Sequence, residues 1–460
     1  MTIETMEFKE DGGPRYKQVA DAIEGRIADG SLSGGSKLPT HRALADRLGV
    51  TIGTITRAYS EAERRGLVEA RIGAGTYVCQ HDKPTWIFDQ NRNTVDVSFG
   101  YNVPPPIERA NWMAEALNTL ARYPDELNEL MLYQPAKGID SHREALADWL
   151  QSQNVNARPE HMLLCHGAQH GIKLVVEALC RAGDTILVEQ LCYPGLISTA
   201  RQQQLTLKPV LMDDEGIVPE SLEAACRLYQ PRLVYLTPTL QNPTTATMSD
   251  ARRAAVADVC RRHKVYILED DVNGLLPEKR PAPLVNLAPE LVIHVSGFAK
   301  FLAPGLRMGF VLAPEDLYPA FIRTLQNHSW MVSPLLSALT AMMARKGVAE
   351  DTLNQVRRDM AARWERVGEL LTGFDVRYHP NGLHGWLLLP DTWPLSKFLA
   401  RCSEERLDVK SAELFVPPGY AALPAVRIAV SAPKELASLE QGIATLADIL
   451  ASPPADEFTL

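Results

Sequence analysis

Hydrophobic residues in the first eighty positions recur mainly at helical spacing. One apolar face begins shortly after Pro14, with members three or four residues apart: Tyr16, Val19, Ile23 and Ile27. Thr40 and Thr51 precede two shorter amphipathic stretches, and a threonine hydroxyl there can accept a hydrogen bond from the free backbone N–H groups of a first helical turn. The pattern therefore predicts three helices in this part of the chain.

Two β-prone segments, 67–72 and 76–78, follow the third predicted helix, and Gly73, Ala74 and Gly75 join them. Three helices and a two-stranded hairpin are the elements of a winged helix-turn-helix, in which the third helix lies in a DNA major groove. A small helical bundle with a solvated polar face accounts for the periodicity equally well.

From about residue 96 to 450, short β-rich runs alternate with amphipathic helical patterns. The β-rich runs are 162–165, 185–189, 207–210, 233–237, 265–270, 292–296 and 309–313. This alternation predicts an α/β fold with a mostly parallel sheet covered by helices on both faces. Because the alternation loosens after Ala313, we expect a smaller α+β subdomain from about residue 330.

Composition is that of a globular protein. Of the 460 residues, 46% are hydrophobic and 22% are charged, which excludes wholesale disorder. No apolar run approaches the roughly 18 residues of a membrane span, and no secretory signal pattern opens the sequence. The seven cysteines are scattered without a C-x-x-C pair, which favours free thiols over disulfides or a zinc finger. We therefore expect a cytoplasmic protein.

The charge is distributed unevenly along the chain. The net charge is −9, yet residues 13–80 carry ten basic and seven acidic side chains, whereas residues 81–460 carry 36 and 45. A small basic unit thus precedes a large acidic one, which by itself is weak support for DNA binding. We expect a DNA-binding domain at 1–80, a polar linker at 81–95 and a second domain at 96–460.

Residues 38–78, LPTHRALADRLGVTIGTITRAYSEAERRGLVEARIGAGTYV, resemble the DNA-binding domain of GntR-type regulators, with matching internal spacing. Hydroxyls near a helix start suit phosphates, and an arginine can read guanine or hold a phosphate. The resemblance implies DNA contacts from Arg42, Thr51, Thr54, Arg57 and the wing around Gly75. Arg71, beside the wing, can approach the minor groove.

Lys300 is the first chemical candidate of the second domain, because it lies among apolar and small residues. Burial disfavours the charged ammonium, lowers its pKa and makes the amine available to form an imine. Arg307, seven residues later, can hold an anion such as phosphate. A surface position is the commoner location of a lysine, so the residue alone leaves both interpretations open.

Further candidates follow the predicted strands. Asp270 ends an apolar strand, where α/β folds bind ligands, and its carboxylate can keep a pyridine nitrogen protonated. A helix cap or a solvated turn is the alternative there. Asn242 can donate to a phenolate oxygen, although Asn-Pro is also an ordinary turn. Tyr193 can stack on a planar ring, and Arg427 can clamp a carboxylate.

A possible phosphate cradle follows the strand at 162–165. Gly167, Ala168 and Gln169 begin a predicted helix there, and the free N–H groups of a helix start bind anions. Histidines such as His384 lack ligand-like partners in the sequence, so we expect no metal site.

These candidate residues occur along the chain in the same order as in fold-type I aminotransferases, which use pyridoxal 5′-phosphate (PLP). The chain from about 96 to 450 therefore resembles that family. The resemblance implies that Lys300 forms the Schiff base and that Asp270 partners the pyridine nitrogen. It also implies that Arg427 holds a substrate carboxylate. The other implied cofactor contacts are Asn242 at the ring hydroxyl, Tyr193 stacked on the ring, Arg307, Ala168 and Gln169 near the phosphate, and Tyr133 reaching the phosphate of the neighbouring subunit.

Several positions depart from that family pattern, among them Ala299 in place of a common serine and Thr245 in place of a common glycine. Asn273 stands where a tyrosine usually contacts the ring hydroxyl, and Gly297 stands where a serine or threonine usually touches the phosphate. Ser296, next to Gly297, is the hydroxyl that we assign to the cofactor instead. Because asparagine is a poorer donor to a phenolate than tyrosine, these departures favour sensing over efficient turnover.

The whole chain resembles the MocR subfamily of GntR-type regulators. This resemblance implies a transcriptional regulator that binds double-stranded promoter DNA through residues 14–80 and senses PLP, or an amino compound condensing with it, through residues 96–450. It also implies a homodimer arranged head to tail with swapped domains. Two alternatives stay open: a genuine aminotransferase with an accessory DNA-binding domain, and a cofactor-free scaffold.

Overall fold

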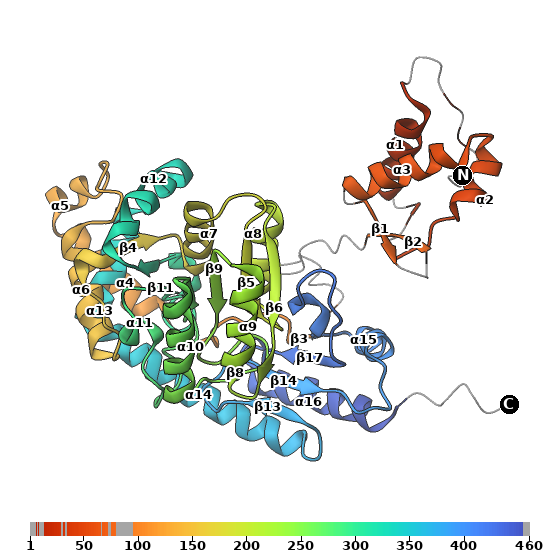
Figure 1. Cartoon of the computed structure of the whole chain (residues 1–460). Helices are drawn as coiled ribbons and strands as arrows, with labels where there is room; N and C mark the ends of the chain where they lie inside the picture. The colour runs from red at the N-terminus through yellow and green to blue at the C-terminus, as the bar shows by residue number, and fades with distance from the viewer. Residues whose placement is uncertain are drawn as a thin grey trace. The chain divides into compact units, whose positions relative to one another are not determined.

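The computed structural model describes residues 6, 8, 13–28, 31–32, 35–65, 67–71, 75–79 and 95–453 (Figure 1). The chain divides into two compact units, Met1–Phe88 and Asp89–Leu460. Apart from Val95, the expected linker lies outside the described residues, as do Gly73 and Ala74 of the hairpin. No helix within the described ranges is long and apolar enough to cross a membrane.

The described part of the first unit has the predicted three helices and hairpin. These elements are α1 (Arg15–Ala28), α2 (His41–Leu48), α3 (Ile52–Arg64), β1 (Val68–Arg71) and β2 (Gly75–Val78), and the two strands pair antiparallel. Thr40 and Thr51 accept hydrogen bonds from the N–H groups of Ala43 and Thr54, at 3.3 and 3.2 Å. Both predicted helix caps are therefore confirmed.

Apolar faces of the three helices form the core of the first unit. Ile23 of α1, Leu44 of α2 and Ile55 of α3 are fully buried in one cluster. The Tyr59 hydroxyl donates to the Pro39 carbonyl at 2.8 Å and so holds α3 against the turn before α2. The inward faces predicted from helical spacing are the ones that pack.

The second unit is built on a sheet that, among the described residues, has seven strands. Its order is β4 (Met162–Cys165), β12 (Gly309–Leu312), β11 (Val292–Gly297), β10 (Tyr266–Asp270), β9 (Leu233–Leu236), β5 (Thr185–Glu189) and β6 (Thr206–Val210). All neighbouring strands pair parallel except β12, which is antiparallel to both of its neighbours. The α/β prediction is confirmed, and each predicted strand boundary lies within one residue of the observed one.

Helices cover both faces of this sheet (Figure 1). Alternate residues along β5 show the two faces, because Ile186 and Val188 belong to one buried cluster and Leu187 to another. The first face carries α7 (Ala168–Leu179), α8 (Pro194–Gln202) and α12 (Tyr318–Ser329). The second carries α4 (Ala110–Ala121), α6 (Asp140–Ser152), α9 (Pro219–Tyr229), α10 (Asp250–His263), α11 (Leu284–Leu287), α13 (Pro334–Arg345) and α14 (Val348–Leu370).

A smaller subdomain surrounds an antiparallel sheet in the order β13 (Val376–Tyr378), β14 (Gly385–Leu388), β17 (Ala425–Ile428) and β16 (Lys410–Ser411). Helices α15 (Leu395–Glu404) and α16 (Leu436–Ala451) belong to the same region. The start of the second unit joins it, because β3 (Val97–Ser98) pairs parallel with β15 (Leu407–Asp408). Further short elements are α5 (Pro124–Glu129), β7 (Met212–Asp213), β8 (Gly216–Ile217) and the 3-10 helices at Pro159–His161, Pro304–Leu306, Glu315–Leu317 and Ala412–Phe415.

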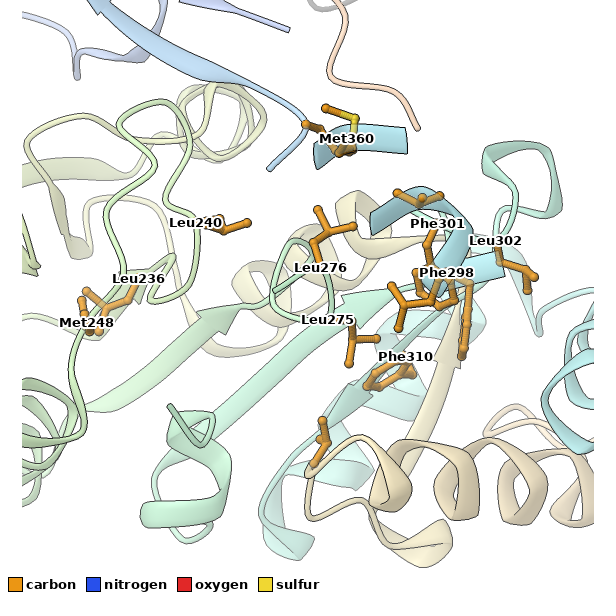
Figure 2. Close-up of a cluster of buried hydrophobic side chains, with 14 of the residues drawn as sticks. Leu236, Leu240, Met248, Leu275, Leu276, Phe298, Phe301, Leu302, Phe310 and Met360 are labelled. Atoms are coloured by element: carbon orange, nitrogen blue, oxygen red, sulfur yellow. The ribbon is translucent and has the colours of Figure 1, made fainter. Parts of the chain in front are cut away.

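An aromatic platform surrounds the segment that carries Lys300. Figure 2 shows Phe298, Phe301 and Phe310 packed together in the buried cluster. The ring centroids of Phe298 and Phe310 lie 5.9 Å apart, and Trp149 stacks on Phe301 at 5.5 Å. Because large rings on both sides of residue 300 are buried, the backbone there is held in one position.

Trp364 offers a test of the packing of the smaller subdomain. Its ring is buried, stacks on Tyr378 at 4.4 Å and donates from Nε1 to the Gly382 carbonyl at 2.6 Å. We expect Trp364→Ala to lower the free energy of unfolding of the second unit by about 3–5 kcal/mol, because it removes a large buried ring. Urea unfolding followed by far-UV circular dichroism measures this loss.

The control for this change is Trp364→Phe, which keeps an aromatic ring but removes the donor. We expect it to destabilise the second unit by less than half as much as Trp364→Ala. Equal stabilities of Trp364→Ala and the wild type would contradict the assigned packing.

Candidate functional site

The candidate residues converge at one edge of the large sheet. The carboxyl ends of β4, β5, β9, β10 and β11 meet there, together with the amino end of the antiparallel β12. Gly167 follows β4, Asp270 ends β10, Lys300 follows β11 and Arg307 precedes β12. Three segments that are far apart in the sequence, the last of which carries both Lys300 and Arg307, therefore lie at the edge where α/β folds bind ligands.

Asp270 is held as a hydrogen-bond acceptor at this edge. Its side chain is 3% exposed, and the Tyr235 hydroxyl donates to Oδ2 at 2.6 Å. Burial raises the pKa of Asp270 to about 6, while the bond from Tyr235 opposes that rise. Sequence reasoning missed Tyr235, because an aromatic residue inside a strand has the pattern of an ordinary core residue.

Lys300 carries an amine that is partly withdrawn from water. The side chain is half-buried, and Nζ donates to the Asn102 carbonyl at 2.6 Å. Burial and the nearby Arg427 charge lower the pKa of Lys300 to about 8, while Asp270 acts in the opposite direction. At pH 7 roughly a tenth of this side chain is therefore the free amine, far more than for an ordinary lysine, and its apolar surroundings in the sequence predicted a shift in this direction.

Arg427 and Asn242 are brought together from distant parts of the chain. Arg427 is 7% exposed and donates from Nη1 to Asn242 Oδ1 at 3.0 Å and from Nη2 to the Gly100 carbonyl at 2.7 Å. Its guanidinium lies 5.2 Å from the centre of the Phe415 ring. Burial lowers the pKa of Arg427 to about 10. Within the described residues its Nε has no hydrogen-bond partner, so the group has a donor left for a ligand.

The turn after β4 has the geometry of an anion site. Gly167 has a φ of +77°, and α7 starts at Ala168, so the first N–H groups of the helix are free of helical partners. Arg307 donates from Nη2 to the His166 carbonyl at 3.3 Å, and a Cβ on Gly167 would lie 3.0 Å from the same nitrogen. Glycine is therefore required both by the backbone angle and by the approach of Arg307. Free donors, a helix start and a guanidinium together suit a phosphate.

Tyr193 and Gln169 border this turn. Tyr193 immediately precedes α8, and burial, followed by the Asp270 charge, raises the pKa of its hydroxyl to about 12. The Gln169 amide donates to the Gly195 carbonyl at 3.2 Å and to Thr199 Oγ1 at 3.3 Å. The side chain of Gln169 is thus used within the protein, and its backbone N–H is the group left for an anion.

Ser296 and Tyr133, the two remaining residues assigned to the cofactor from the sequence, have different surroundings. The Ser296 hydroxyl donates to the Asp271 carbonyl at 3.0 Å, so its proton is already used. A side chain on Gly297 would meet the Met308 carbonyl oxygen at 2.9 Å, which explains the glycine there. Tyr133 is 83% exposed, and its ring contacts Trp330, with centroids 6.0 Å apart.

Asn102 and His384 complete the site and were not assigned to it from the sequence. Because His384 Nε2 faces the Gln241 carbonyl at 3.3 Å, it donates, and Nδ1 accepts from the Asn102 amide at 3.1 Å. Burial and the Arg427 charge lower the pKa of His384 to about 3, so it is neutral. Among the described side chains, no group of His, Cys, Asp and Glu residues is arranged to hold a metal ion.

Asn273 is buried beside the same strand edge. Its Nδ2 donates to the Leu240 carbonyl at 3.0 Å, while no described group bonds to its Oδ1. The amide donor that replaces the usual tyrosine is thus directed to the backbone.

In the first unit, Arg42 and Arg57 are exposed on α2 and α3, and neither forms an ion pair within the described residues. The Thr51 and Thr54 hydroxyls bond to each other at 2.9 Å as part of the α3 cap. Gly75 begins β2 with a φ of +114°, and Arg71 ends β1.

Two family descriptions match the chain. Residues 15–78 match the bacterial regulatory proteins of the gntR family, and residues 110–435 match aminotransferase class I and II. The two matches fall in the two compact units.

Curated relatives share this organisation along most of their length. YdeF of Bacillus subtilis, described as an uncharacterized HTH-type transcriptional regulator, is 31% identical over 95% of this chain and 94% of its own. MocR of Rhizobium meliloti, a probable rhizopine catabolism regulatory protein, is 28% identical over 76% of each chain. PtsJ of Salmonella typhimurium, a vitamin B6 salvage pathway transcriptional repressor, is 27% identical over 82% of this chain and 86% of its own.

Solved structures match the second unit. LysN of Thermus thermophilus, an α-aminoadipate aminotransferase complexed with N-(5′-phosphopyridoxyl)-L-leucine, has a TM-score of 0.70 at 25% identity, covering 77% of this chain and 92% of its own. Kynurenine aminotransferase of Pyrococcus horikoshii has a TM-score of 0.72 at 20% identity, covering 80% and 93%. This second likeness shows the fold alone.

PLP is the cofactor indicated by this fold. The residues present fit it: Lys300 offers an amine, Asp270 a buried carboxylate, and the turn at Gly167 an anion site. The matches of the two units also agree with the predicted DNA-binding domain and aminotransferase-like domain. The chain therefore belongs to the GntR family of bacterial transcriptional regulators, in the MocR group that joins a helix-turn-helix unit to an aminotransferase class I and II domain.

Proposed function

We propose that this regulator binds PLP covalently through Lys300, and that binding of PLP, or of an amino compound that condenses with it, changes its affinity for promoter DNA. The observation that carries the proposal is the Lys300 amine, half-buried, bonded to the Asn102 carbonyl at 2.6 Å and with a pKa near 8. When bound, PLP supplies an aldehyde that reacts with amines. The naming of PtsJ as a regulator of vitamin B6 salvage supports a B6-linked signal for this chain.

The cofactor contacts that we propose follow from the donors and acceptors at the site. The Asp270 carboxylate would accept from the protonated pyridine nitrogen, and the Tyr235 hydroxyl holds that carboxylate in place. Asn242 would donate to the ring hydroxyl, and the Tyr193 ring would stack on the coenzyme.

The phosphate is held, in our proposal, by the N–H groups of Ala168 and Gln169 together with Arg307. In our proposal Ser296 contributes less to phosphate binding than the sequence suggested, because its hydroxyl already donates to the Asp271 carbonyl. Tyr133 reaches the phosphate of a partner subunit, which its exposed ring supports.

Arg427 would hold the carboxylate of an amino-acid effector. Its Nη atoms bond within the protein, but Nε is free of partners among the described residues. A carboxylate can accept two parallel hydrogen bonds from a guanidinium, and the rearrangement that frees them would move Gly100 or Asn242.

An effector can change the affinity for DNA only if it binds one arrangement of the two units better than another. We propose that this occurs in a head-to-tail homodimer with swapped domains, so that two helix-turn-helix units read two half-sites of an operator. Because it must reach the chromosome, we propose that the protein acts in the cytoplasm.

An aminotransferase is the second candidate function, favoured by the presence of Lys300, Asp270 and Arg427 in one site. It requires steady conversion of an amino donor and a 2-oxo acid. The direction of the Asn273 amide to the Leu240 carbonyl favours sensing over turnover, because the ring hydroxyl loses a donor.

Covalent attachment at Lys300 is the first test. We expect wild-type protein mixed with PLP to develop a visible absorbance band, and borohydride followed by peptide mapping to label Lys300 alone. Lys300→Ala should abolish the band and the label, because it removes the amine that Asp270 and Arg427 influence at the site. Lys397→Ala, which removes an exposed lysine of the second unit, is the control and should behave as wild type.

Labelling of a different lysine would contradict the site assignment. A colourless wild-type protein would support the cofactor-free scaffold. Steady transamination that Lys300→Ala abolishes would favour the enzyme hypothesis.

The pH dependence of attachment is the second test. Only the unprotonated amine attacks an aldehyde, so the attachment rate should rise about tenfold per pH unit below about pH 8 and level off above it. Arg427→Gln removes a charge that lowers the pKa of Lys300, so the midpoint of the curve of attachment rate against pH should move to higher pH. Asp270→Asn removes a charge that raises it, so the midpoint should move to lower pH. Stopped-flow absorbance measures the midpoints, and shifts in the same direction would contradict the assignment.

DNA binding by α3 is the third test. Arg57→Ala should weaken binding to duplexes selected by the wild-type protein from a random pool by about 1–3 kcal/mol, because it removes an unpaired arginine from the exposed face. If Arg57 contacts a phosphate, the slope of log affinity against log salt should become shallower by about 0.9. Fluorescence anisotropy across a salt series measures both.

Arg401→Ala is the control, since Arg401 is an exposed arginine of the second unit paired with Glu404 and Glu405. Equal losses in the two variants would argue against α3 as the DNA-reading helix.

A further inference from the structure

A row of histidines leads away from the phosphate turn. The His166 backbone N–H donates to His170 Nδ1 at 3.0 Å, His170 Nε2 lies 3.0 Å from His328 Nδ1, and His328 Nε2 bonds to Glu177. Centroids of successive rings are 5.2 Å apart. We call these four residues the histidine row. It joins the start of α7 to the end of α12, two helices that lie side by side (Figure 1).

The hydrogen-bond directions in the histidine row admit a single proton arrangement. A backbone N–H can only donate, so His170 Nδ1 accepts and carries no proton. The neutral His170 ring then has its proton on Nε2 and donates to His328 Nδ1. His328 in turn has its proton on Nε2 and donates to the Glu177 carboxylate. Each bond therefore determines the tautomer of the next ring.

Glu177 accepts the last hydrogen bond of the histidine row and is itself held in place. Its Oε1 accepts from the Gln203 amide at 2.7 Å and lies 3.3 Å from Lys173 Nζ. Because both carboxylate oxygens have partners, Glu177 is held as an acceptor, which is the role the row requires.

His166 is held at both of its backbone groups. His170 accepts from its N–H, and Arg307 donates to its carbonyl. The next residue, Gly167, donates to the Cys165 carbonyl at 2.9 Å. His170 is the third residue of α7, and its side chain reaches back to the chain before the helix, as the acidic residue of a capping box does. The orientation of the turn thus depends on an uncharged acceptor at residue 170.

We propose that His170 is a positioning residue for phosphate binding. As the Nε2–H tautomer maintained by His328 and Glu177, His170 holds the His166–Gly167 turn in place. The Ala168 and Gln169 N–H groups and Arg307 then face one phosphate. The inference rests on the proposed binding of PLP. It assigns no contact between His170 and the coenzyme. Burial and the neighbouring rings of His166 and His328 lower the pKa of His170 to about 4, so the acceptor persists at neutral pH.

Nitrogen-15 NMR of histidine-labelled full-length protein tests the row directly. We expect His170 and His328 to be Nε2–H tautomers at pH 7, with signals assigned through His170→Asn and His328→Asn. A His170 ring with its proton on Nδ1 would overturn the proposal, whether or not PLP binds.

Binding of PLP and of pyridoxal, which lacks the phosphate, tests the positioning role. Asparagine carries an oxygen at the position of Nδ1 and can accept from the His166 N–H, whereas the polar atoms of glutamine reach the position of Nε2. We expect His170→Gln to weaken PLP binding about tenfold, the effect of losing one hydrogen bond, and to leave pyridoxal binding unchanged. We expect His170→Asn to stay within about twofold of wild type for both compounds.

His379→Gln is the matched control, because His379 Nδ1 accepts from the Asn381 N–H at 3.1 Å, away from the phosphate turn. Equal effects of His170→Gln and His170→Asn, or equal losses for PLP and pyridoxal, would overturn the proposal. Wild-type protein that binds neither compound would instead contradict the proposed function, while the tautomers would still report on the row.

Discussion

The hydrogen bond from Lys300 to the Asn102 carbonyl is the interaction on which the chemistry of the second unit depends. It holds an amine where burial and Arg427 disfavour its charge and Asp270 partly restores it. The aromatic platform around Phe298 and Phe301 keeps the backbone of the lysine in place (Figure 2). A reactive amine at one defined position is what recognition of an aldehyde requires, because the reacting atoms must meet in a fixed geometry.

The parallel sheet explains why so many functional groups share one edge. Neighbouring parallel strands end on the same side, so Asp270 and the turn at Gly167 are brought near Lys300 although the chain between them is long. The same edge provides an acceptor for a cation and donors for an anion. A coenzyme with a protonated ring nitrogen and a phosphate matches that division of charge.

Contacts around the amine also connect the start of the second unit to the smaller subdomain. Asn102 bonds to His384, and Gly100 bonds to Arg427, so the start of the unit is joined to the smaller subdomain through the site itself. A ligand that competes for Arg427 would alter this connection. In the proposed function, an effector changes DNA affinity by binding one arrangement of the protein better than another, and a contact that the effector can break provides such a difference.

Local patterns in the sequence determined the elements and the helix caps at Thr40 and Thr51, because spacing and capping are properties of neighbouring residues. They also singled out Lys300 and Asp270 as candidate reactive groups, and that role stays a prediction. Tertiary structure alone decided that Tyr235 donates to Asp270, that the Ser296 hydroxyl donates to the Asp271 carbonyl, and that Asn102 and His384 lie at the site. Those contacts join residues with no common period or motif, and for Asn102 and His384 the separation is 282 positions. Tertiary packing brings these residues together. The pattern of neighbouring residues in the sequence does not indicate which distant residues will come into contact.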